Sequence, residues 1–309
     1  MKRKLKIKPI IILIIIILAI IFGIVYLIKT INYHKTYEYK FIKNGYNKED
    51  IISLEKLDNT SLDYLLTIPY NENIINLINE KYFMEKNLKK YISYLDKNSN
   101  LNDVIAIINV GANDNWYSNT KKTDVKKDHL LLTNKFYYLD NTYNSDNMVN
   151  VSKKYSYGEN QMLTSETYNA FIEMFNAAKK ENLTLIINSS YRSYEDQEEI
   201  YNDLKNSKGE EYADKIAAKP GHSEHQTGMS IDIQTYGSTA ATFEEYEEFN
   251  WLKQNAHKYG FILRYPKDKE FLTGYEYESW HYRYVGTEAA TYIYENNITF
   301  DEYYAYFIN

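Results

Sequence analysis

The sequence GHSEHQTGMSIDI occupies residues 221–233, and the shorter sequence ESWH follows at 278–281. Gly228 permits a turn after His225. In the next five residues, MSIDI, apolar side chains alternate with polar ones. This alternation predicts a half-buried strand in which Asp232 lies on the face opposite to the apolar side chains. A histidine in a loop and an aspartate in a strand can therefore converge on one site.

Glu278 and His281 lie three positions apart, so on a helical turn or at the mouth of a kinked strand both side chains can face one cavity. Two imidazoles and one carboxylate can fill three tetrahedral positions of a zinc ion and leave the fourth for a water. His225, Asp232 and His281 form such a set, and Glu278 is left to accept a proton. His222, three positions before His225, is an alternative ligand. Alone, His225 with Asp232 is also typical of a surface histidine and a strand-ending aspartate, and Glu278 with His281 of a partly exposed glutamate and a histidine bonded within the core. Together the two pairs favour a zinc hydrolase.

The sequence SSYRSYEDQ, at 189–197, follows a short strand-like run at 183–187 and carries Ser193 and Asp196 at the spacing of a helix capping box. It therefore predicts a strand-to-helix turn, where side chains commonly point into a site. We expect Tyr191 and Arg192 to face that site, where a cation can hold a carboxylate or stabilise an oxyanion. The alternative is a structural role for Arg192 in an ion pair with a nearby glutamate.

The C-terminal half mixes helical and strand signals. Thr164 can cap a helix that has one apolar face, and Thr299 with Glu302 marks a last short helix. Residues 242–259 are amphipathic over the length of a helix, and 261–265 has the composition of a strand. This pattern predicts an α+β domain.

The sequence PIIILIIIILAIIFGIVYLI, at 9–28, is uncharged, and twenty helical residues span roughly 30 Å, the thickness of a bilayer core. We expect a transmembrane helix; the alternative, a cleaved signal peptide, would have a shorter apolar run that ends in small residues. Residues 1–8 form a basic tail, which predicts a cytoplasmic N-terminus. Everything after residue 30 then faces outward, so we expect a single-pass protein of the cell membrane with an extracellular domain.

Residues 31–115 carry leucines and isoleucines at spacings of three and four, which predicts a helical stalk or small helical module. Its role is either that of a spacer or that of a cell-wall-binding segment. The polar stretch 113–127 is the expected boundary, and a second domain covers 128–309. The net charge of −6 gives no electrostatic reason to bind nucleic acid. Because the chain has no cysteine, we expect the outer domain to be held by its core and its metal.

Four segments together resemble the VanY-like zinc D-alanyl-D-alanine carboxypeptidases, which trim cell-wall peptides and share a core with the hedgehog signalling domain. The segments are SSYRSYEDQ at 189–197, GHSEHQTGMSIDI at 221–233, WLKQNAHKYGFILRYP at 251–266 and ESWHYRYVG at 278–286. The likeness extends from about residue 134 to the C-terminus. It implies a small antiparallel sheet with flanking helices, and it makes 128–309 the catalytic domain.

The resemblance also implies roles for single residues. His225, Asp232 and His281 would bind one zinc ion, with His225 rather than His222 as the loop ligand, and Glu278 would be the catalytic base. Arg192 would steady the substrate carbonyl. Gln197 and Ser223 would help to line the substrate pocket, and we expect Tyr191, on the same turn as Arg192, to contribute to it.

The sequence departs from the family pattern at a few positions. Ser230 stands where the family usually has alanine, and Ser279 stands where proline usually precedes the tryptophan. The segment 143–146 lacks the customary proline. These departures put the shape of the substrate pocket in doubt and leave the ligands in place.

The resemblance implies a membrane-anchored enzyme that removes the C-terminal D-alanine from peptidoglycan stem pentapeptides. Two enzymatic alternatives share the same metal site: an L,D-carboxypeptidase acting on tetrapeptide stems and a peptidoglycan endopeptidase. A non-catalytic wall-binding module is a further alternative. The expected partners are the stem peptide and the membrane, with neither nucleic acid nor an obligate protein partner.

Overall fold

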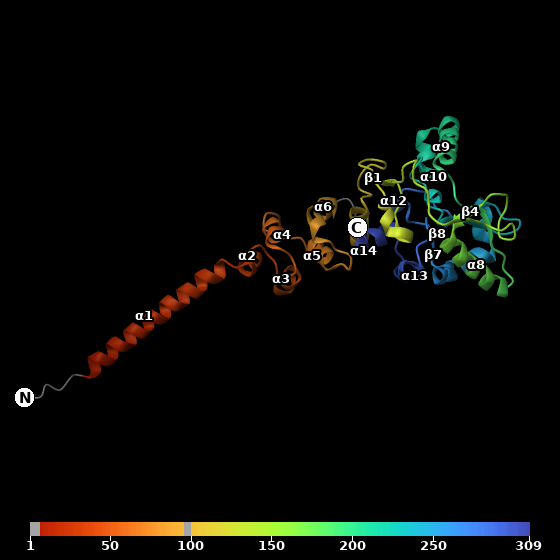
Figure 1. The fold of residues 1–309 in the computed structure, drawn as a ribbon. Coiled ribbons are helices and arrows are strands. Elements are labelled where there is room, and N and C mark those ends of the chain that lie inside the picture. The colour runs from red at the N-terminus through yellow and green to blue at the C-terminus, as the bar shows by residue number, and fades with distance from the viewer. Residues whose placement is uncertain (1–6, 96–99) are drawn as a thin grey trace, which may run out of the picture. The chain divides into compact units, whose positions relative to one another are not determined.

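The computed structural model describes residues 7–95 and 100–309 (Figure 1). The expected basic tail at 1–8 therefore lies mostly outside the described residues. The chain divides into two compact units, Met1–Ile105 and Ala106–Asn309.

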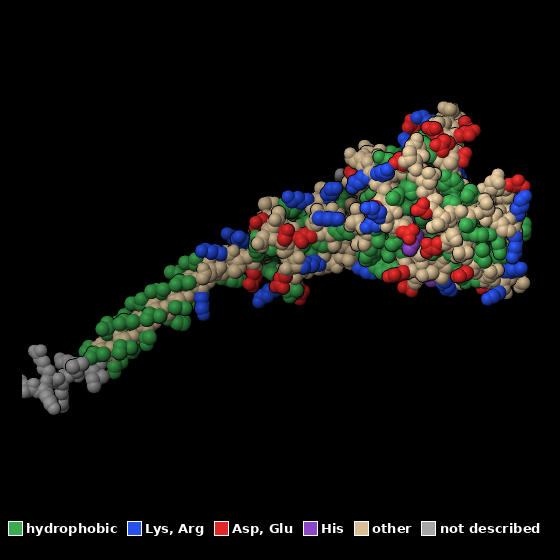
Figure 2. All heavy atoms as spheres, viewed as in Figure 1, with side chains coloured by type: hydrophobic (Ala, Val, Ile, Leu, Met, Phe, Trp, Pro, Cys, Tyr) green, Lys and Arg blue, Asp and Glu red, His purple; other side chains and the backbone are tan. Residues whose placement is uncertain are grey.

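The first unit begins with a long helix, α1 (Ile7–His34). Its segment Lys8–His34 is long and apolar enough to cross a membrane, a property that it would share with a signal sequence. Hydrophobic side chains cover its surface along most of its length (Figure 2). The expected apolar span, 9–28, thus lies within one continuous helix.

Short helices follow α1, as the leucine and isoleucine spacing predicts. They are α2 (Tyr37–Lys43), α3 (Lys48–Leu54), α4 (Asn59–Leu65), α5 (Glu72–Asn79), η1 (Glu85–Asn87), α6 (Leu88–Tyr94) and α7 (Leu101–Val110). Thr36, Asn47, Asp58 and Asn71 cap the helices α2 to α5, each accepting a hydrogen bond from a backbone N–H of the first turn. A hydrophobic cluster of its own, which includes Phe41, Leu54, Leu65, Ile78 and Leu88, lies between these helices.

A four-stranded antiparallel sheet forms the centre of the second unit, as predicted. Its strands are β5 (Ile186–Ser189), β6 (Ser230–Gln234), β8 (His281–Tyr284) and β7 (Phe261–Leu263), in that order. Two smaller sheets accompany it: β1 (Lys121–Lys122) with β2 (Tyr137–Tyr138), which run parallel, and β3 (Met148–Asn150) with β4 (Met162–Thr164), which run antiparallel.

Helices surround this sheet. They are α8 (Ser165–Lys180), α9 (Tyr194–Lys208), α10 (Glu210–Ile216), α11 (Glu247–Asn255), α12 (Glu270–Thr273), α13 (Thr287–Asn296) and α14 (Phe300–Phe307), with 3-10 segments η3 (Val125–Leu130), η4 (Glu224–Thr227), η5 (Ala240–Glu245) and η6 (Ala256–Tyr259). Phe171 and Met174 of α8 share a buried core with Ile187, Ile231 and Ile233 of the sheet. One face of the sheet is thereby sealed, and the opposite side of β6 is left for polar residues.

The structure confirms the predicted caps and changes two predicted segments. Thr164, Ser193 and Thr299 cap α8, α9 and α14. The amphipathic stretch 242–259 is not one helix, because Tyr246 has an extended backbone that separates η5 from α11. The strand expected to start at 183 starts at Ile186, where the pairing with Gln234 of β6 begins.

We expect Gly221→Ala to destabilise the second unit. Gly221 has a φ of +83°, and a Cβ there would lie 2.4 Å from the carbonyl oxygen of Leu139. The left-handed backbone alone costs an ordinary residue about 1–3 kcal/mol, and the collision adds to this cost. Gly209, with a φ of +91° and no heavy atom within 4 Å of its Cβ position, provides the matched control.

Thermal unfolding followed by tryptophan fluorescence measures both variants, since Trp116, Trp251 and Trp280 are the chain's three tryptophans and all belong to the second unit. Gly209→Ala should lower the unfolding midpoint less than Gly221→Ala does. Equal shifts would show that the approach of Leu139 contributes nothing.

Candidate active site

The candidate site is assembled by β6, β8 and the loop that precedes β6. Gly228, with a φ of +69°, turns the chain from η4, which carries His225, toward β6. In the antiparallel pairing of β6 with β8, Asp232 lies directly opposite His281. This register is what brings two residues far apart in the sequence to one place.

His225, Asp232 and His281 form a compact cluster whose candidate ligand atoms all lie within 4.8 Å of one another. Asp232 Oδ1 is 3.5 Å from His225 Nε2 and 3.0 Å from His281 Nδ1. His225 Nδ1 donates to the carbonyl oxygen of Ser190 at 2.6 Å, so its Nε2 is free to bind an ion. Two imidazole nitrogens and one carboxylate, largely buried, are a donor set that fits zinc.

His222 is engaged elsewhere. Its Nδ1 lies 2.7 Å from the carbonyl oxygen of Asn134, and its ring packs against Tyr117 and Tyr138. His222 is therefore not part of the cluster, and the position of the loop ligand is left to His225.

The charges of the cluster are set by burial and by close partners. Burial raises the pKa of Asp232, but His225 and His281 oppose this more strongly and hold it well below its usual range. Burial lowers the pKa of His225, and Asp232 opposes this effect only in part. Burial also acts to lower the pKa of His281, yet its carboxylate neighbours Asp232 and Glu224 raise it to about 9. Asp232 is thus an anion at neutral pH, ready to face a cation.

Glu278 lies beside the cluster, in the turn that leads into β8. Its Oε2 is 3.7 Å from His281 Nδ1, and its backbone N–H donates to the carbonyl oxygen of Tyr265. Burial raises the pKa of Glu278 to about 7; Asp232 adds to the rise, whereas His281 and Arg192 oppose it. A carboxyl group with a pKa near 7 can both accept and return a proton at neutral pH.

A cavity of about 130 Å³ opens onto the cluster. Its lining comprises Arg192, Gln197, Ile200, Ile216, Ala217, Ala218, Ser223, Glu224, His225, Asp232, Tyr265, Tyr275, Glu278 and His281. Every residue that the sequence predicts for the site is in this lining except Tyr191, whose backbone N–H donates to the carbonyl oxygen of Met162.

Arg192 is held by neutral partners. Its guanidinium donates to Gln197 Oε1 at 2.9 Å and to Ser189 Oγ at 3.2 Å. Gln197 in turn donates to the carbonyl oxygen of Ala218, which ties α9 to the wall of the cavity. Within the described part of the chain no carboxylate forms a salt bridge with Arg192, so the structural ion pair considered from the sequence is not formed.

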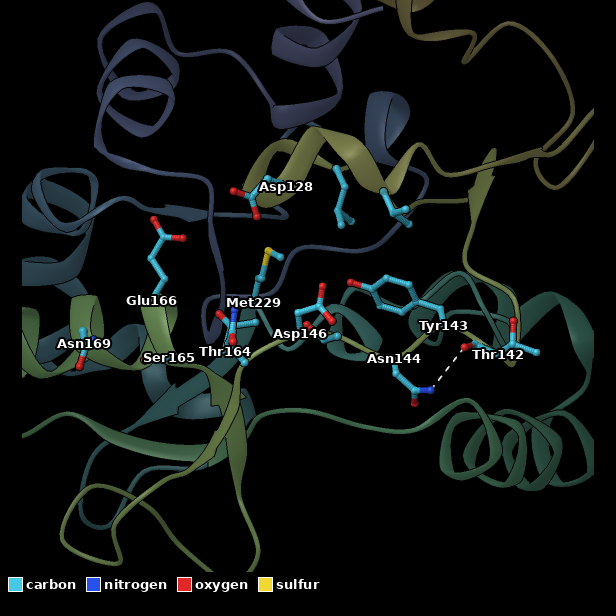
Figure 3. A pocket seen from close by; sticks show the side chains of 14 residues that line it. Asp128, Thr142, Tyr143, Asn144, Asp146, Thr164, Ser165, Glu166, Asn169 and Met229 are labelled. Carbon is cyan, nitrogen blue, oxygen red and sulfur yellow. Dashed lines mark hydrogen bonds between the residues drawn. The ribbon is translucent and has the colours of Figure 1, made fainter.

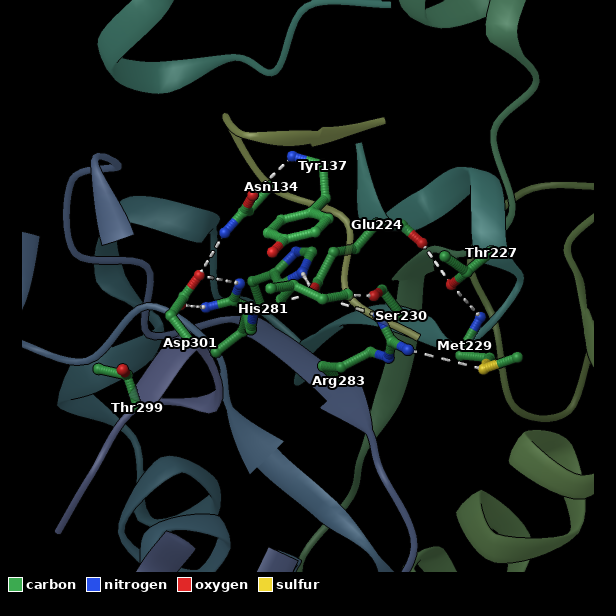
Figure 4. A network of polar contacts seen from close by, with 12 residues as sticks. Asn134, Tyr137, Glu224, Thr227, Met229, Ser230, His281, Arg283, Thr299 and Asp301 are labelled. Carbon is green, nitrogen blue, oxygen red and sulfur yellow. Dashed lines mark hydrogen bonds and ion pairs between the residues drawn. The ribbon is translucent and has the colours of Figure 1, made fainter. Parts of the chain in front are cut away.

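A buried network of charges lies behind His281, and the sequence analysis did not predict it. Glu224 Oε1 accepts from Arg264 Nε at 2.7 Å and from Arg283 Nη1 at 3.3 Å, and Arg264 also donates to Asp301 (Figure 4). The side chains of Glu224 and both arginines are fully buried. One signal was available: Arg264 follows the apolar run of β7, and Arg283 lies between two tyrosines of β8.

A larger cavity, of about 770 Å³, lies elsewhere in the second unit (Figure 3). Asp128 and Glu166 line it, and together with His129 they form another group of possible ligands. The side chains of Asp128 and Glu166 are 77% and 56% exposed, so water can satisfy them. The candidate ligands at the smaller cavity are buried, and nearly all of the residues predicted for the site line that cavity. Both observations favour the smaller cavity as the active site.

Comparisons with known proteins match the part of the chain that holds this cavity. Residues 160–287 match the VanY family, D-alanyl-D-alanine carboxypeptidase. A D-alanyl-D-alanine carboxypeptidase of Enterococcus faecium is 37% identical over 207 residues, which are 64% of this chain and 65% of the relative. YodJ of Bacillus subtilis (strain 168) is 43% identical over 184 residues, 57% of this chain and 66% of the relative. The chain thus spans just under two thirds of the length of these two curated relatives.

Two solved structures are similar to more than half of the chain. The LdcB LD-carboxypeptidase matches with a TM-score of 0.58 and 38% identity, covering 61% of this chain and 91% of that one. A mutant of the vancomycin resistance D,D-pentapeptidase VanY, in complex with Zn(II), matches with a TM-score of 0.50 and 32% identity, covering 57% of this chain and 98% of that one. The second of these similar structures therefore contains zinc.

Proposed function

Because the chain belongs to the VanY family of D-alanyl-D-alanine carboxypeptidases, we propose that it is a zinc metallopeptidase that removes the C-terminal D-alanine from peptidoglycan stem pentapeptides. The observation that carries the proposal is the convergence of His225, Asp232, His281 and Glu278 on one small cavity. Structural roles alone would not require a proton acceptor and three ligands to meet there.

In this proposal His225, Asp232 and His281 hold one zinc ion. When bound, zinc supplies Lewis-acid chemistry, polarising a carbonyl group and lowering the pKa of water. Glu278 takes the proton of the attacking water, whose oxygen forms a bond with the carbonyl carbon of the scissile peptide. The bond from that carbon to nitrogen then breaks, and Glu278 passes the same proton to the leaving amine.

The lining of the cavity suits a substrate whose C-terminal residue is small. Ile200, Ile216, Ala217 and Ala218 form an apolar wall, which suits the methyl group of an alanine. Arg192 supplies positive charge in the same cavity, where it can donate to the substrate's carbonyl oxygen or carboxylate. Gln197 and Ser223 act on the site through Arg192 and His225: Gln197 accepts from the guanidinium, and Ser223 Oγ accepts from the backbone N–H of His225.

We expect Arg192→Ala to lower kcat by about 10²–10³-fold, because it removes a donor aimed at the developing charge. Arg192→Lys should recover part of the rate, since it keeps the charge but loses the planar, forked donor geometry. Steady-state hydrolysis measures both variants, and a thermal unfolding midpoint close to that of the wild type excludes misfolding. This role would be contradicted if the rate of Arg192→Ala stayed within about threefold of the wild type, because the loss of such a donor should have a much larger effect.

The second candidate is an L,D-carboxypeptidase that acts on tetrapeptide stems. The similarity to LdcB favours it, since the TM-score and identity exceed those of the match to VanY. Both reactions use the same metal chemistry, so the difference lies in how the cavity wall receives the residue before the scissile bond.

We further propose that α1 anchors the protein in the cell membrane as a single pass, with a cytoplasmic N-terminus and an extracellular catalytic domain at 128–309. The basic residues before α1 and the location of peptidoglycan outside the membrane support this orientation. The helical segment 31–115 would then act as a stalk or module between the anchor and that domain.

The test is mass spectrometry of muramyl pentapeptide and tetrapeptide after incubation with the full-length protein in detergent. Loss of one alanine from the pentapeptide, abolished by a chelator and restored by zinc, is the expected result. Cleavage of the tetrapeptide alone would replace the proposal by the L,D reaction. If the zinc-loaded protein leaves both peptides intact, neither carboxypeptidase function holds.

A further inference from the structure

The two histidines of the metal cluster present opposite ring nitrogens to it. His225 faces Asp232 with Nε2, while its Nδ1 donates to the Ser190 carbonyl oxygen. His281 faces Asp232 with Nδ1. Its Nε2 is buried and has no hydrogen-bond partner among the described residues, and the nearest carboxylate oxygen is Glu224 Oε2, at 3.5 Å. A buried nitrogen without a partner requires an explanation.

Glu224 is placed to provide that partner. Both arginines donate to its Oε1, Arg264 at 2.7 Å and Arg283 at 3.3 Å. Its Oε2 accepts from Ser230 Oγ at 3.3 Å and faces His281 (Figure 4). The arginines therefore fix the rotation of the carboxylate and leave one oxygen directed at the imidazole.

The proton on Nδ1 of His281 must leave when an ion binds to that nitrogen. In the present arrangement Nδ1 is 3.0 Å from a carboxylate oxygen of Asp232, which can only accept, so Nδ1 carries a proton. A nitrogen that gives its lone pair to a metal cannot keep that proton, and the neutral ring then carries its one proton on Nε2. That N–H is directed toward Glu224 Oε2.

We propose that Glu224 is a positioning residue of the metal centre, which accepts the Nε2 proton of His281 and so fixes the tautomer and ring orientation in which Nδ1 binds the ion. This inference rests on the zinc site of the proposed function. Arg264 and Arg283 act one step further away, because they hold Glu224 in place. A carboxylate behind a ligating histidine raises the basicity of the ligand and sets its direction.

Glu224→Gln tests the proposal sharply. The arginines need an acceptor, so the amide oxygen takes the place of Oε1 and the NH₂ group takes the place of Oε2. A donor then faces Nε2 and stabilises the tautomer that carries its proton on Nδ1, which cannot bind the ion. We expect the zinc affinity of the full-length protein in detergent, measured by competition with a chromogenic chelator, to fall about 10–100-fold.

Asp301→Asn is the matched control. Like Glu224→Gln, it removes one negative charge from the buried network and withdraws a carboxylate from Arg264. The hydrogen bonds of the Asp301 carboxylate run to Arg264 and Asn134, whereas His281 faces Glu224. The zinc affinity of this variant should stay within about threefold of the wild type, even if its unfolding midpoint falls. That change is much smaller than the loss expected for a residue that orients a ligand. Equal losses of affinity in the two variants, or unchanged affinity in Glu224→Gln, would overturn the proposal.

A measurement on the wild-type protein does not depend on whether a variant folds. With ¹⁵N-labelled histidine and zinc bound, imidazole NMR should show His281 protonated at Nε2 and His225 protonated at Nδ1. An unprotonated Nε2 on His281 would overturn the inference. Failure of the wild type to bind zinc would instead overturn the proposed function, and this inference with it.

Discussion

Glu278→Gln is expected to lower kcat for the peptide substrate by about 10²–10⁴-fold while the protein still binds one zinc ion. The amide has nearly the volume of the carboxyl group but can neither take a proton from water nor return it to an amine. The buried position that raises the pKa of Glu278 to about 7 is what suits it to both tasks. The measurement is single-turnover hydrolysis with the zinc content determined in the same samples.

The control for this variant is Glu276→Gln. Glu276 lies in the same segment between α12 and β8 but does not line the cavity. It should leave both the rate and the zinc content unchanged. If Glu278→Gln keeps its zinc and more than a tenth of the wild-type rate, the proton acceptor must be another group.

Arg264→Met is expected to destabilise the second unit by about 3–5 kcal/mol, since removing one partner leaves buried charges without compensation. Arg264 Nε donates to Glu224 at 2.7 Å, and its Nη1 donates to Asp301 at the same distance. Methionine fills a similar space but supplies no donor to either carboxylate. Denaturant unfolding followed by tryptophan fluorescence reports this unit, which holds all three tryptophans.

Lys205→Met is the matched surface substitution. Lys205 pairs with Glu210 at 2.9 Å, but the two side chains are 42% and 52% exposed. Solvent screens such pairs, so the expected change is below about 1 kcal/mol. Similar losses for the two variants would mean that burial adds nothing to the cost of breaking the network.

Local patterns in the sequence predicted part of the geometry of the candidate site, and the family resemblance selected His225 over His222. The alternation from Ser230 to Ile233 placed Asp232 on the face opposite Ile231 and Ile233, and the structure confirms this arrangement. The spacing of Glu278 and His281 predicted a shared cavity, which the structure also has. The register that sets Asp232 opposite His281 depends on pairing between distant strands, and no local pattern encodes it.

The network around Glu224 could not be predicted in the same way. Charged residues usually face solvent, so the apolar or aromatic neighbours of Arg264 and Arg283 in the sequence were only a weak sign of burial. Their partners, Glu224 and Asp301, come from two other segments of the chain. A charge is recognised as buried only when the elements that enclose it are known, and here that required β7, β8, η4 and α14 together.

In the proposed function, the groups that perform chemistry and those that select a substrate belong to different parts of the fold. Asp232 and His281 are fixed by backbone pairing within the sheet, and Glu278 lies three residues from His281. The apolar wall belongs to α9, α10 and the two residues after α10. If the proposed function holds, substitutions of Ile200 and Ile216, which do not hold Arg192, can alter which peptide is accepted without disturbing the reaction, so specificity can evolve separately from catalysis.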